Sequence, residues 1–388
     1  MQQISRDKLF ILGIFFFFIS SSFLWKSIMV TRILQLICIV VFTLSFRVKP
    51  EKNTKFPRLY KILILLVLLW GILIIIRGDN YDHLAIVRKV CSADGVFEYI
   101  APLLLFFPLY KYFNYTLNIT TKILYLYIIL VFMNLPMIIY RGDGIINIIS
   151  ILYSFLGGSL PFLIIFFNYL SRKQKVIVTI ATFVVGVIAI WLARRGMLLG
   201  LLSAYLFYLL IWLLKQRHLL IKLIFISMAG MIIYCYLLPM LLNLSFLQSI
   251  TTKGFDDTRT LVEEYLWDDI SQDFNTVLYG VGIDGAYYAP NIDTIADYRY
   301  SIETGYLHLL LKGGVVYLIL MGLIFLLPII KGLFRGRSTM SKCASLYLLH
   351  CVCMMYPGNP CRFLPTYFLM WLCVSLIYSE NSKKQIQT

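Results

Sequence analysis

Runs of near-continuous apolar residues constrain this chain more than any other feature. Each run reaches or approaches the ~20 residues that a helix needs to cross the hydrocarbon core of a bilayer. Only 14% of the residues are charged, against about 25% in a soluble globular protein. We therefore predict an all-α polytopic membrane protein, and we exclude a soluble enzyme, a secreted disulfide scaffold and a disordered protein. About twelve transmembrane helices are expected, at residues 9–24, 28–46, 60–76, 97–113, 119–140, 148–170, 175–193, 196–214, 219–240, 305–330, 343–357 and 363–379.

The distribution of charge predicts the orientation of these spans. Basic residues gather in the cytoplasmic loops of membrane proteins. With the N-terminus inside and the loops alternating, most of the 35 Lys and Arg residues fall on the inside. All acidic residues except Asp7, Glu51 and Glu380 then fall on the outside. The net charge of +16 thus indicates a basic cytoplasmic rim rather than a nucleic-acid surface, and we expect an inner-membrane protein with both termini in the cytoplasm.

One outer loop, residues 243–304, is much longer than the other connections. It is acidic and rich in Tyr and Trp. Long loops on a rigid scaffold often carry function, and the aromatic content argues against disorder. Apolar residues at helical spacing predict an amphipathic helix at 258–270, lying at the interface or over the helix bundle. The chain therefore divides into N-terminal transmembrane helices (1–190), a core that includes the loop (191–340), and C-terminal helices with a cytoplasmic tail (341–388).

Two adjacent arginines, Arg194 and Arg195, fall at the outer end of a span, where basic residues are not expected. The guanidinium group binds phosphate through two parallel hydrogen bonds. We therefore favour an anion site over a pair that snorkels to the interface. Arg259 opens the helix of the long loop. By itself it is better explained by a surface ion pair, but beside Arg195 it becomes a second clamp on the same anion.

The long loop also contains a GxGxxG string, Gly280-Val281-Gly282-Ile283-Asp284-Gly285. A dinucleotide site requires this string between a strand and a helix of a βαβ unit. An outer loop between membrane spans does not provide that context, so we reject the nucleotide interpretation. We expect these glycines to make tight turns with positive φ.

Glu303 lies where the long loop re-enters the membrane. A carboxylate at that boundary is partly desolvated and can serve as a base, and an interface carboxylate paired with Arg299 is an alternative of similar weight. His308 lies about one turn further in, and without a visible partner it is better explained as a packing residue. With four histidines and no metal-ligand spacing, we expect no metal site. Cys91 and Cys361 lie near segment ends, where a disulfide is the less favoured alternative to free thiols.

Three short motifs occur in a fixed order and on the same side of the membrane. The first is Arg195-Gly196 at the outer end of a span. The second comprises Arg259, Trp267 and the segment Leu278-Tyr279-Gly280-Val281-Gly282, and the third runs from Glu303 to Gly314. In this order and spacing the chain resembles the bacterial O-antigen polymerase and ligase family (Wzy-like polysaccharide polymerases), firmly over about 190–330 and only in topology before that. Ligases of that family typically have His-Asn eleven residues before the glycine of the third motif. Glu303-Thr304 stands there in this chain, which resembles the polymerase pattern.

The resemblance implies a membrane glycosyltransferase at the periplasmic face of the bacterial inner membrane. Its donor would be a glycan on undecaprenyl pyrophosphate, and its product the O-antigen of lipopolysaccharide or a capsule. Arg195 and Arg259 would neutralise the departing pyrophosphate, and Glu303 would deprotonate or orient the acceptor hydroxyl, with no metal or other cofactor required. The residues implied in substrate binding are Arg194, Arg299, Tyr265, Trp267 and Tyr306. The implied partners are the lipid-linked oligosaccharide, membrane lipid, a chain-length regulator and a flippase, and no nucleic acid.

Two other functions compete with a polymerase. A ligase would transfer the same donor to a different acceptor. A transporter or flippase would show paired internal repeats with broken helices at the membrane midplane. The two halves of the sequence show no convincing repeat, and polar residues at the middle of the spans are few.

Overall fold

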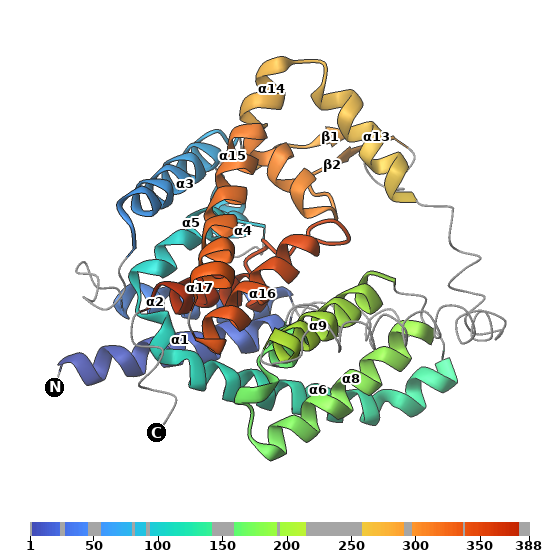
Figure 1. The fold of residues 1–388 in the computed structure, drawn as a ribbon. Coiled ribbons are helices and arrows are strands. Elements are labelled where there is room, and N and C mark those ends of the chain that lie inside the picture. The colour runs from blue at the N-terminus through green and yellow to red at the C-terminus, as the bar shows by residue number, and fades with distance from the viewer. Residues whose placement is uncertain are drawn as a thin grey trace.

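The structure, a computed structural model, describes residues 2–23, 28–45, 56–79, 82–90, 94–141, 159–191, 195–214, 258–290, 297–336 and 338–379. These residues form a mostly helical protein (Figure 1). The first half contains α1 (Gln2–Phe23), α2 (Ile28–Ser45), α3 (Arg58–Ile76), α4 (His83–Val90), α5 (Val96–Ile100), η1 (Ala101–Phe106), η2 (Leu109–Tyr112), α6 (Phe113–Arg141), η3 (Phe167–Tyr169) and α8 (Arg172–Trp191). The second half contains α9 (Arg195–Leu214), α13 (Thr258–Ile270), α14 (Phe274–Tyr279), β1 (Tyr287–Tyr288), β2 (Tyr298–Arg299), α15 (Gly305–Ile330), η5 (Lys331–Arg335), α16 (Thr339–Cys353) and α17 (Pro365–Tyr378).

Four helices are long and apolar enough to cross a membrane: Arg58–Ile76, Arg172–Ile190, Gly196–Leu213 and Gly305–Arg335. A fifth span is possible if Val96–Phe106 and Leu109–Ile129, which meet at 94°, are taken together. The expected class, a helical membrane protein, is consistent with these helices. The predicted span 219–240 lies outside the described residues, and the full set of twelve stays a prediction.

The predicted span 97–113 is not one straight helix. The segment consists of the short helix α5 and the two 3₁₀ helices η1 and η2. Proline lacks a backbone N–H and does not fit a helix interior. Pro102 stands in the first turn of η1, and Pro108 precedes η2 with a non-helical ψ of 61°. These prolines divide the apolar run and bend it into α6.

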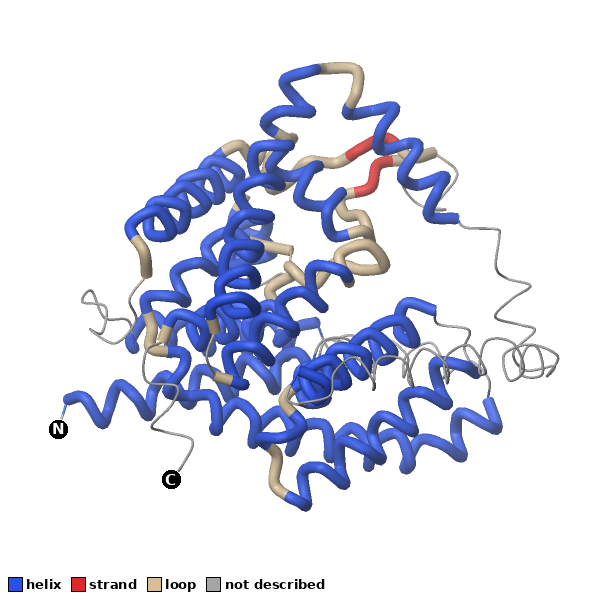
Figure 2. The backbone as a smooth tube through the Cα atoms, in the orientation of Figure 1, coloured by secondary structure: helices blue, strands red, loops and turns tan. Residues whose placement is uncertain are grey.

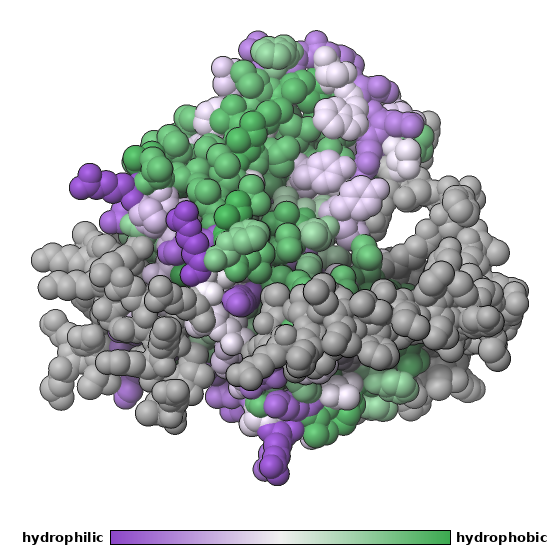
Figure 3. Space-filling view, in the orientation of Figure 1, coloured by the Kyte–Doolittle hydropathy of each residue, from purple (hydrophilic) through white to green (hydrophobic). Residues whose placement is uncertain are grey.

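The outer faces of the long helices are apolar. α3 buries Tyr60, Val67 and Ile74 against the rest of the protein, while its other side is equally hydrophobic. Figure 3 shows this apolar surface over α3 and α15. Monomeric soluble proteins rarely expose apolar patches of this extent, so lipid is the environment that suits this face. The exposed apolar residues of α3 are Leu59, Ile62, Leu65, Leu66, Leu69, Ile72, Leu73 and Ile76.

The main hydrophobic core surrounds α17. Every residue of that helix except Thr366 is buried, and Trp371 and Tyr367 are among the largest side chains with no exposure. α16 packs beside it, and α15 is joined to α3 by a hydrogen bond from the Tyr60 hydroxyl to the carbonyl of Ile324 (2.9 Å). These contacts fix α15 at the centre of the protein, where it carries the side chains discussed below.

The described part of the long loop folds into a cap, defined here as residues 258–290 and 297–302. The cap comprises α13, α14 and the antiparallel pair of β1 and β2, which lie together at the top of Figure 2. It has a small core of its own, in which Leu266 and Ile270 of α13 meet Tyr287, Ile302 and the first residues of α15. The predicted helix at 258–270 is confirmed as α13. The cap is thus ordered against the start of α15.

Candidate functional site: a buried charged network beneath the cap

Helix α15 is broken near the cap. Gly314 has φ 70° and ψ −175°, which divides the helix into Gly305–Gly313 and a longer second segment. Such a break leaves backbone carbonyls without intrahelical partners. The carbonyls of Leu311 and Lys312 accept hydrogen bonds from the backbone N–H groups of Val281 (2.8 Å) and Gly282 (3.0 Å). The cap therefore terminates the first segment of α15.

The glycine loop, residues 279–285, makes this contact because its glycines allow close approach. Gly280 and Gly282 have φ values of 73° and 91°, which confirms the expectation of positive φ at these two glycines, whereas it is wrong for Gly285. A Cβ on Gly280 would lie 2.5 Å from the backbone nitrogens of Gly313 and Gly314. The GxG string thus serves as a backbone joint between the cap and α15.

Side chains from α3 and its end hold the same joint from the other side. The Trp70 indole N–H donates to the carbonyl of Gly313 (2.9 Å), and its ring stacks on Tyr279 at 6.0 Å. The Arg77 guanidinium donates to the carbonyls of Tyr279 (2.6 Å) and Gly280. The loop is therefore clamped between α3 and α15.

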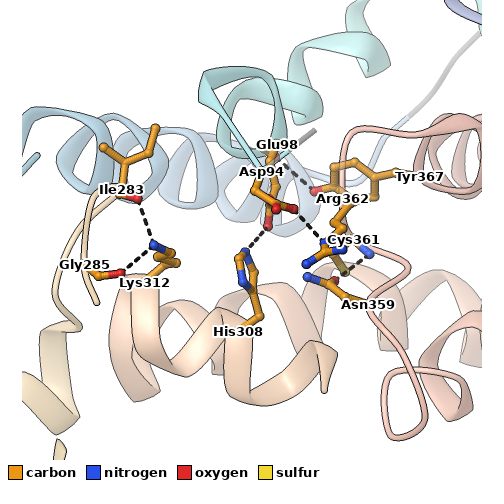
Figure 4. A network of polar contacts seen from close by, with 10 residues as sticks. All are labelled: Asp94, Glu98, Ile283, Gly285, His308, Lys312, Asn359, Cys361, Arg362 and Tyr367. Carbon is orange, nitrogen blue, oxygen red and sulfur yellow. Dashed lines mark hydrogen bonds and ion pairs between the residues drawn. The ribbon is translucent and has the colours of Figure 1, made fainter. Parts of the chain in front are cut away.

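Glu98 and His308 form a buried acid–base pair below this joint (Figure 4). His308 Nε2 lies 3.2 Å from Glu98 Oε1, and neither side chain is exposed. Sequence analysis treated His308 as a packing residue without a partner, and the structure gives it a carboxylate from α5. The Tyr367 hydroxyl on α17 also donates to the backbone carbonyl of Glu98 (3.3 Å). Removing such groups from water is costly unless they are paired, which explains why the two residues meet.

Further ionised side chains surround the pair. Arg362 Nε lies 2.7 Å from Asp94 Oδ1, and the ammonium group of Lys89 is paired with Asp284. Lys312 lies one turn after His308, is almost fully buried, and donates to the carbonyls of Ile283 (2.9 Å) and Gly285 (2.7 Å). Three carboxylates therefore accompany three cations. We call these six residues and His308 the charged network: Lys89, Asp94, Glu98, Asp284, His308, Lys312 and Arg362.

The spacing of Asp94, Glu98 and His308 bears on metal binding. Each offers one ligand atom, and these atoms lie within 4.8 Å of one another. Carboxylates and imidazole are ligands for zinc and manganese. Arg362 is already paired with Asp94, however, and the cations of the charged network balance its carboxylates. A divalent cation would add two uncompensated charges, so the geometry permits a metal but the electrostatics disfavour one.

Cys361 lies beside this network, in the connection between α16 and α17. It is a free, fully buried cysteine, and its backbone N–H donates to the side-chain carbonyl of Asn359 (3.1 Å). Burial raises the pKa of its thiol well above the usual range, so the sulfur stays protonated and unreactive. Cys91 lies outside the described residues.

The arginines predicted from sequence lie at helix starts. Arg195 is the first residue of α9 and Arg259 the second residue of α13. The structure does not describe their side chains, and Arg194 lies outside the described residues altogether. Glu303 is exposed in the segment just before α15. The clamp and the base therefore stay predictions.

The predicted substrate-binding residues lie on the cap and at the start of α15. Trp267 on α13 is 46% exposed, whereas Tyr265 packs partly into the core of the cap. Arg299 pairs with Tyr287 in the two-stranded sheet. Tyr306 in the first turn of α15 stacks on Tyr356 at 6.5 Å, with an angle of 7° between the rings. These residues lie around the cap rather than in the charged network.

A carboxylate also joins α13 to the start of α15. The Thr304 hydroxyl donates to Glu263 Oε1 (2.7 Å), and the backbone N–H of Gly305 donates to the carbonyls of Met355 (2.8 Å) and Gly358 (3.0 Å). The residue beside Glu303 is therefore fixed on both sides, so Glu303 projects from an anchored segment.

Sequence reasoning missed most of the charged network. One signal was available, because His308 and Lys312 are four residues apart in an apolar helix, and ionisable residues in such helices are functional candidates. Glu98, in another apolar run, offered the same signal. Asp94 and Arg362 lie in connections between helices, where charged residues are ordinary, so nothing in the sequence signalled them.

Comparisons with known proteins identify no relative. No family model, curated protein or solved structure matches this chain.

Proposed function

We propose that this protein is a membrane glycosyltransferase that polymerises lipid-linked oligosaccharide repeat units. The donor would be a glycan on undecaprenyl pyrophosphate, used at the periplasmic face of the bacterial inner membrane. The proposal rests on the resemblance to O-antigen polymerases, and on one structural observation that supports it.

That observation is the contact between two motifs that carry the resemblance. Leu278–Gly282 belongs to the second motif, and Glu303–Gly314 is the third. Their backbones are joined by the hydrogen bonds of Val281 and Gly282 to Leu311 and Lys312. A Cβ on Gly314 would stand 2.2 Å from the carbonyl oxygen of Leu278. Motifs that were recognised separately therefore form one structural unit, as parts of a common site would.

The cap supplies a surface suited to a glycan. It exposes aromatic rings and carboxylates above the apolar helices, and Figure 3 shows these pale and hydrophilic residues at the upper right. The rings of Tyr288 and Tyr298 meet edge to face at 5.5 Å across the two strands. Tyrosine presents an apolar ring with a polar hydroxyl, which matches the apolar face and hydroxyl groups of a sugar ring.

The proposed reaction forms one glycosidic bond for each repeat unit. The acceptor hydroxyl attacks the anomeric carbon of the donor, and the bond from that carbon to the pyrophosphate oxygen breaks. The lipid pyrophosphate departs with the electron pair, and Arg195 and Arg259 neutralise its charge. Glu303 takes the proton of the acceptor hydroxyl. Arg194, Arg299, Tyr265, Trp267 and Tyr306 hold the substrates.

Two alternatives remain to be tested beside a polymerase. A ligase would use the same donor and a different acceptor, and Glu303-Thr304 in place of His-Asn disfavours it. A transporter is favoured by a different observation. Broken helices and buried ionisable residues occur in proton-coupled carriers, and α15 combines a break at Gly314 with the charged network.

The deciding experiment is a glycan ladder. The gene is deleted in its host, and surface glycan is compared after complementation with wild type, Arg195→Ala, Glu303→Gln or the control Arg172→Ala, at matched protein levels. A polymerase predicts single repeat units on the final acceptor in the deletion and in the first two variants, with long polymer in the control. Polymer accumulating on the carrier lipid would establish a ligase instead. An unchanged ladder in the deletion would refute both enzymes and favour the transporter.

A further inference from the structure

The charged network is electrically neutral when Glu98 is ionised and His308 is neutral. Asp94, Glu98 and Asp284 supply three negative charges, and Lys89, Lys312 and Arg362 supply three positive ones. Its centre is closed to solvent, because Glu98 and His308 have no exposed surface and Lys312 is 2% exposed. A charged ligand that enters this centre therefore changes the net charge of a low-dielectric region, where Coulomb interactions with neighbouring charges are strong.

A proton is the ligand that suits the pair at the centre. Glu98 Oε1 and His308 Nε2 are 3.2 Å apart, close enough to share one proton. Within the described residues, none of the four polar side-chain atoms of this pair, the two oxygens of Glu98 and the two ring nitrogens of His308, makes a hydrogen bond. Buried polar atoms without partners are rare and call for an explanation. A proton adds one charge to the balanced network, whereas a divalent metal would add two.

We propose that Glu98 and His308 form a buried proton-binding site, and that its occupancy controls how firmly the glycine loop of the cap is held on α15. The site stands apart from the proposed glycosyl transfer, because none of the residues assigned to that reaction belongs to it. Its ligand is a proton, and binding of that proton changes how firmly the cap is held on α15.

Lys312 links the site to the cap. Its ammonium group lies one helical turn from His308 and is bonded to the carbonyls of Ile283 and Gly285 in the glycine loop. In the unprotonated network, Glu98 supplies the charge opposite Lys312. When a proton neutralises Glu98 or charges His308, Lys312 loses that compensation. The ammonium group is then drawn toward water, and its two bonds to the loop weaken.

The other groups around the pair do not supply a competing charge near neutral pH. Tyr99 beside Glu98, Tyr317 on α15 and Tyr367 on α17 carry hydroxyl groups that are neutral there, and the Cys361 thiol is protonated. Asp94 is paired with Arg362 in the connection before α17. Lys312 already carries its protons in the bonds to the glycine loop. Glu98 and His308 are thus the two groups of the network that can take up a proton without first breaking an ion pair with Arg or Lys.

Amide hydrogen exchange of the full chain in lipid nanodiscs tests the proposal. The reporters are the N–H groups of Val281, Gly282 and Ile283, which are bonded to Leu311, Lys312 and Ile74. Rates are measured from about pH 9 to about pH 5, a range that brackets histidine titration, and are corrected for intrinsic exchange. We expect protection to fall several-fold as the pH falls. Glu98→Gln, which mimics the protonated carboxyl, should hold the low protection at every pH.

One control variant and a second readout make the outcome decisive. Asp7→Asn removes a carboxylate bonded to the Tyr112 hydroxyl (2.9 Å), outside the charged network, and should keep the wild-type pH response. Protection that is independent of pH in the wild type, or a response that survives in Glu98→Gln, overturns the proposal. If Glu98→Gln does not fold, the infrared absorptions of protonated carboxyl groups and of the imidazolium ring are followed in wild type and Asp7→Asn. If neither band grows as the pH falls, the proposal is overturned equally. Stoichiometric zinc or manganese in the purified wild type, lost in Glu98→Asp, would make this a metal site instead.

Discussion

The carbonyl of Leu278 faces the Cα of Gly314 so closely that a Cβ on Gly314 would lie 2.2 Å from the carbonyl oxygen. Gly280 makes the reciprocal approach to the backbone of Gly313 and Gly314. Two segments of the chain thus meet backbone to backbone, without side chains between them. The joint between the cap and the membrane helices therefore depends on glycine at both sides.

Gly314→Ala should weaken this joint. The left-handed φ of 70° costs an alanine about 1–3 kcal/mol, and the added Cβ must also displace Leu278. We expect a lower thermal unfolding midpoint in detergent and faster proteolysis of the cap. Gly322→Ala is the matched control, because it lies in the same helix with no atom within 4 Å of the added Cβ. Equal unfolding midpoints for the two variants would contradict the assigned role of Gly314.

Lys312→Met tests the side-chain link between the cap and α15. Methionine keeps the length of the side chain but leaves the carbonyls of Ile283 and Gly285 without their donor and Glu98 without its counter-charge. Breaking a buried charged interaction from one side costs about 3–5 kcal/mol. We expect the free energy of unfolding, measured by chemical denaturation, to fall by that amount. The control is Lys122→Met, at an exposed lysine of α6. If both lysines prove equally dispensable, the buried link carries no stability.

Several features of the fold were predictable because they depend on local pattern. Apolar runs of sufficient length marked α3, α8, α9 and α15 as membrane helices, and helical spacing marked α13 to the residue. Positive φ at Gly280 and Gly282 followed from their sequence context, although the same expectation is wrong for Gly285. The bend between α5 and α6 was missed, although Pro102 and Pro108 could have indicated it.

The charged network was not predictable because its members come from distant parts of the chain. Glu98 and His308 are 210 positions apart in the sequence, and Asp94 and Arg362, which also meet, are 268 positions apart. Pairing at this range depends on how α5, α15 and the connection before α17 pack. A single sequence reveals which helices carry ionisable residues but not which of these residues meet.

Helix α14 should be sensitive to acid through its N-cap. The Asp273 carboxylate accepts hydrogen bonds from the backbone N–H groups of Asn275 (3.1 Å) and Thr276 (3.3 Å), and from the Thr276 hydroxyl (3.0 Å). These bonds, the one from Asn275 foremost, hold the pKa of Asp273 below its usual value. The ionised Asp273 therefore stabilises the helix fully at pH values above the pKa of about 3.9 that it has in the unfolded chain. This contribution is lost as the pH falls through its pKa in the folded protein.

Amide exchange over residues 274–280 measures that effect. We expect several-fold faster exchange in Asp273→Ala at neutral pH, because the cap is lost. Asp273→Asn retains an acceptor oxygen and should remove the acid sensitivity while keeping most of the protection. If the wild type and Asp273→Asn respond to acid alike, the N-cap is not the source.

Arg259 provides the sharpest test of the proposed reaction. It lies in the first turn of α13, where the partial positive charge of a helix N-terminus also favours an anion. If it stabilises the departing pyrophosphate, Arg259→Ala should lower the transfer rate by about 100-fold or more. Arg259→Lys should recover part of this, since it restores the charge but not the planar, two-pronged geometry. Turnover of a purified lipid-linked donor, with Arg172→Ala as the control at another helix start, gives the comparison. Rates for Arg259→Ala within a few-fold of that control would remove Arg259 from the site and leave the proposed clamp with Arg195 alone.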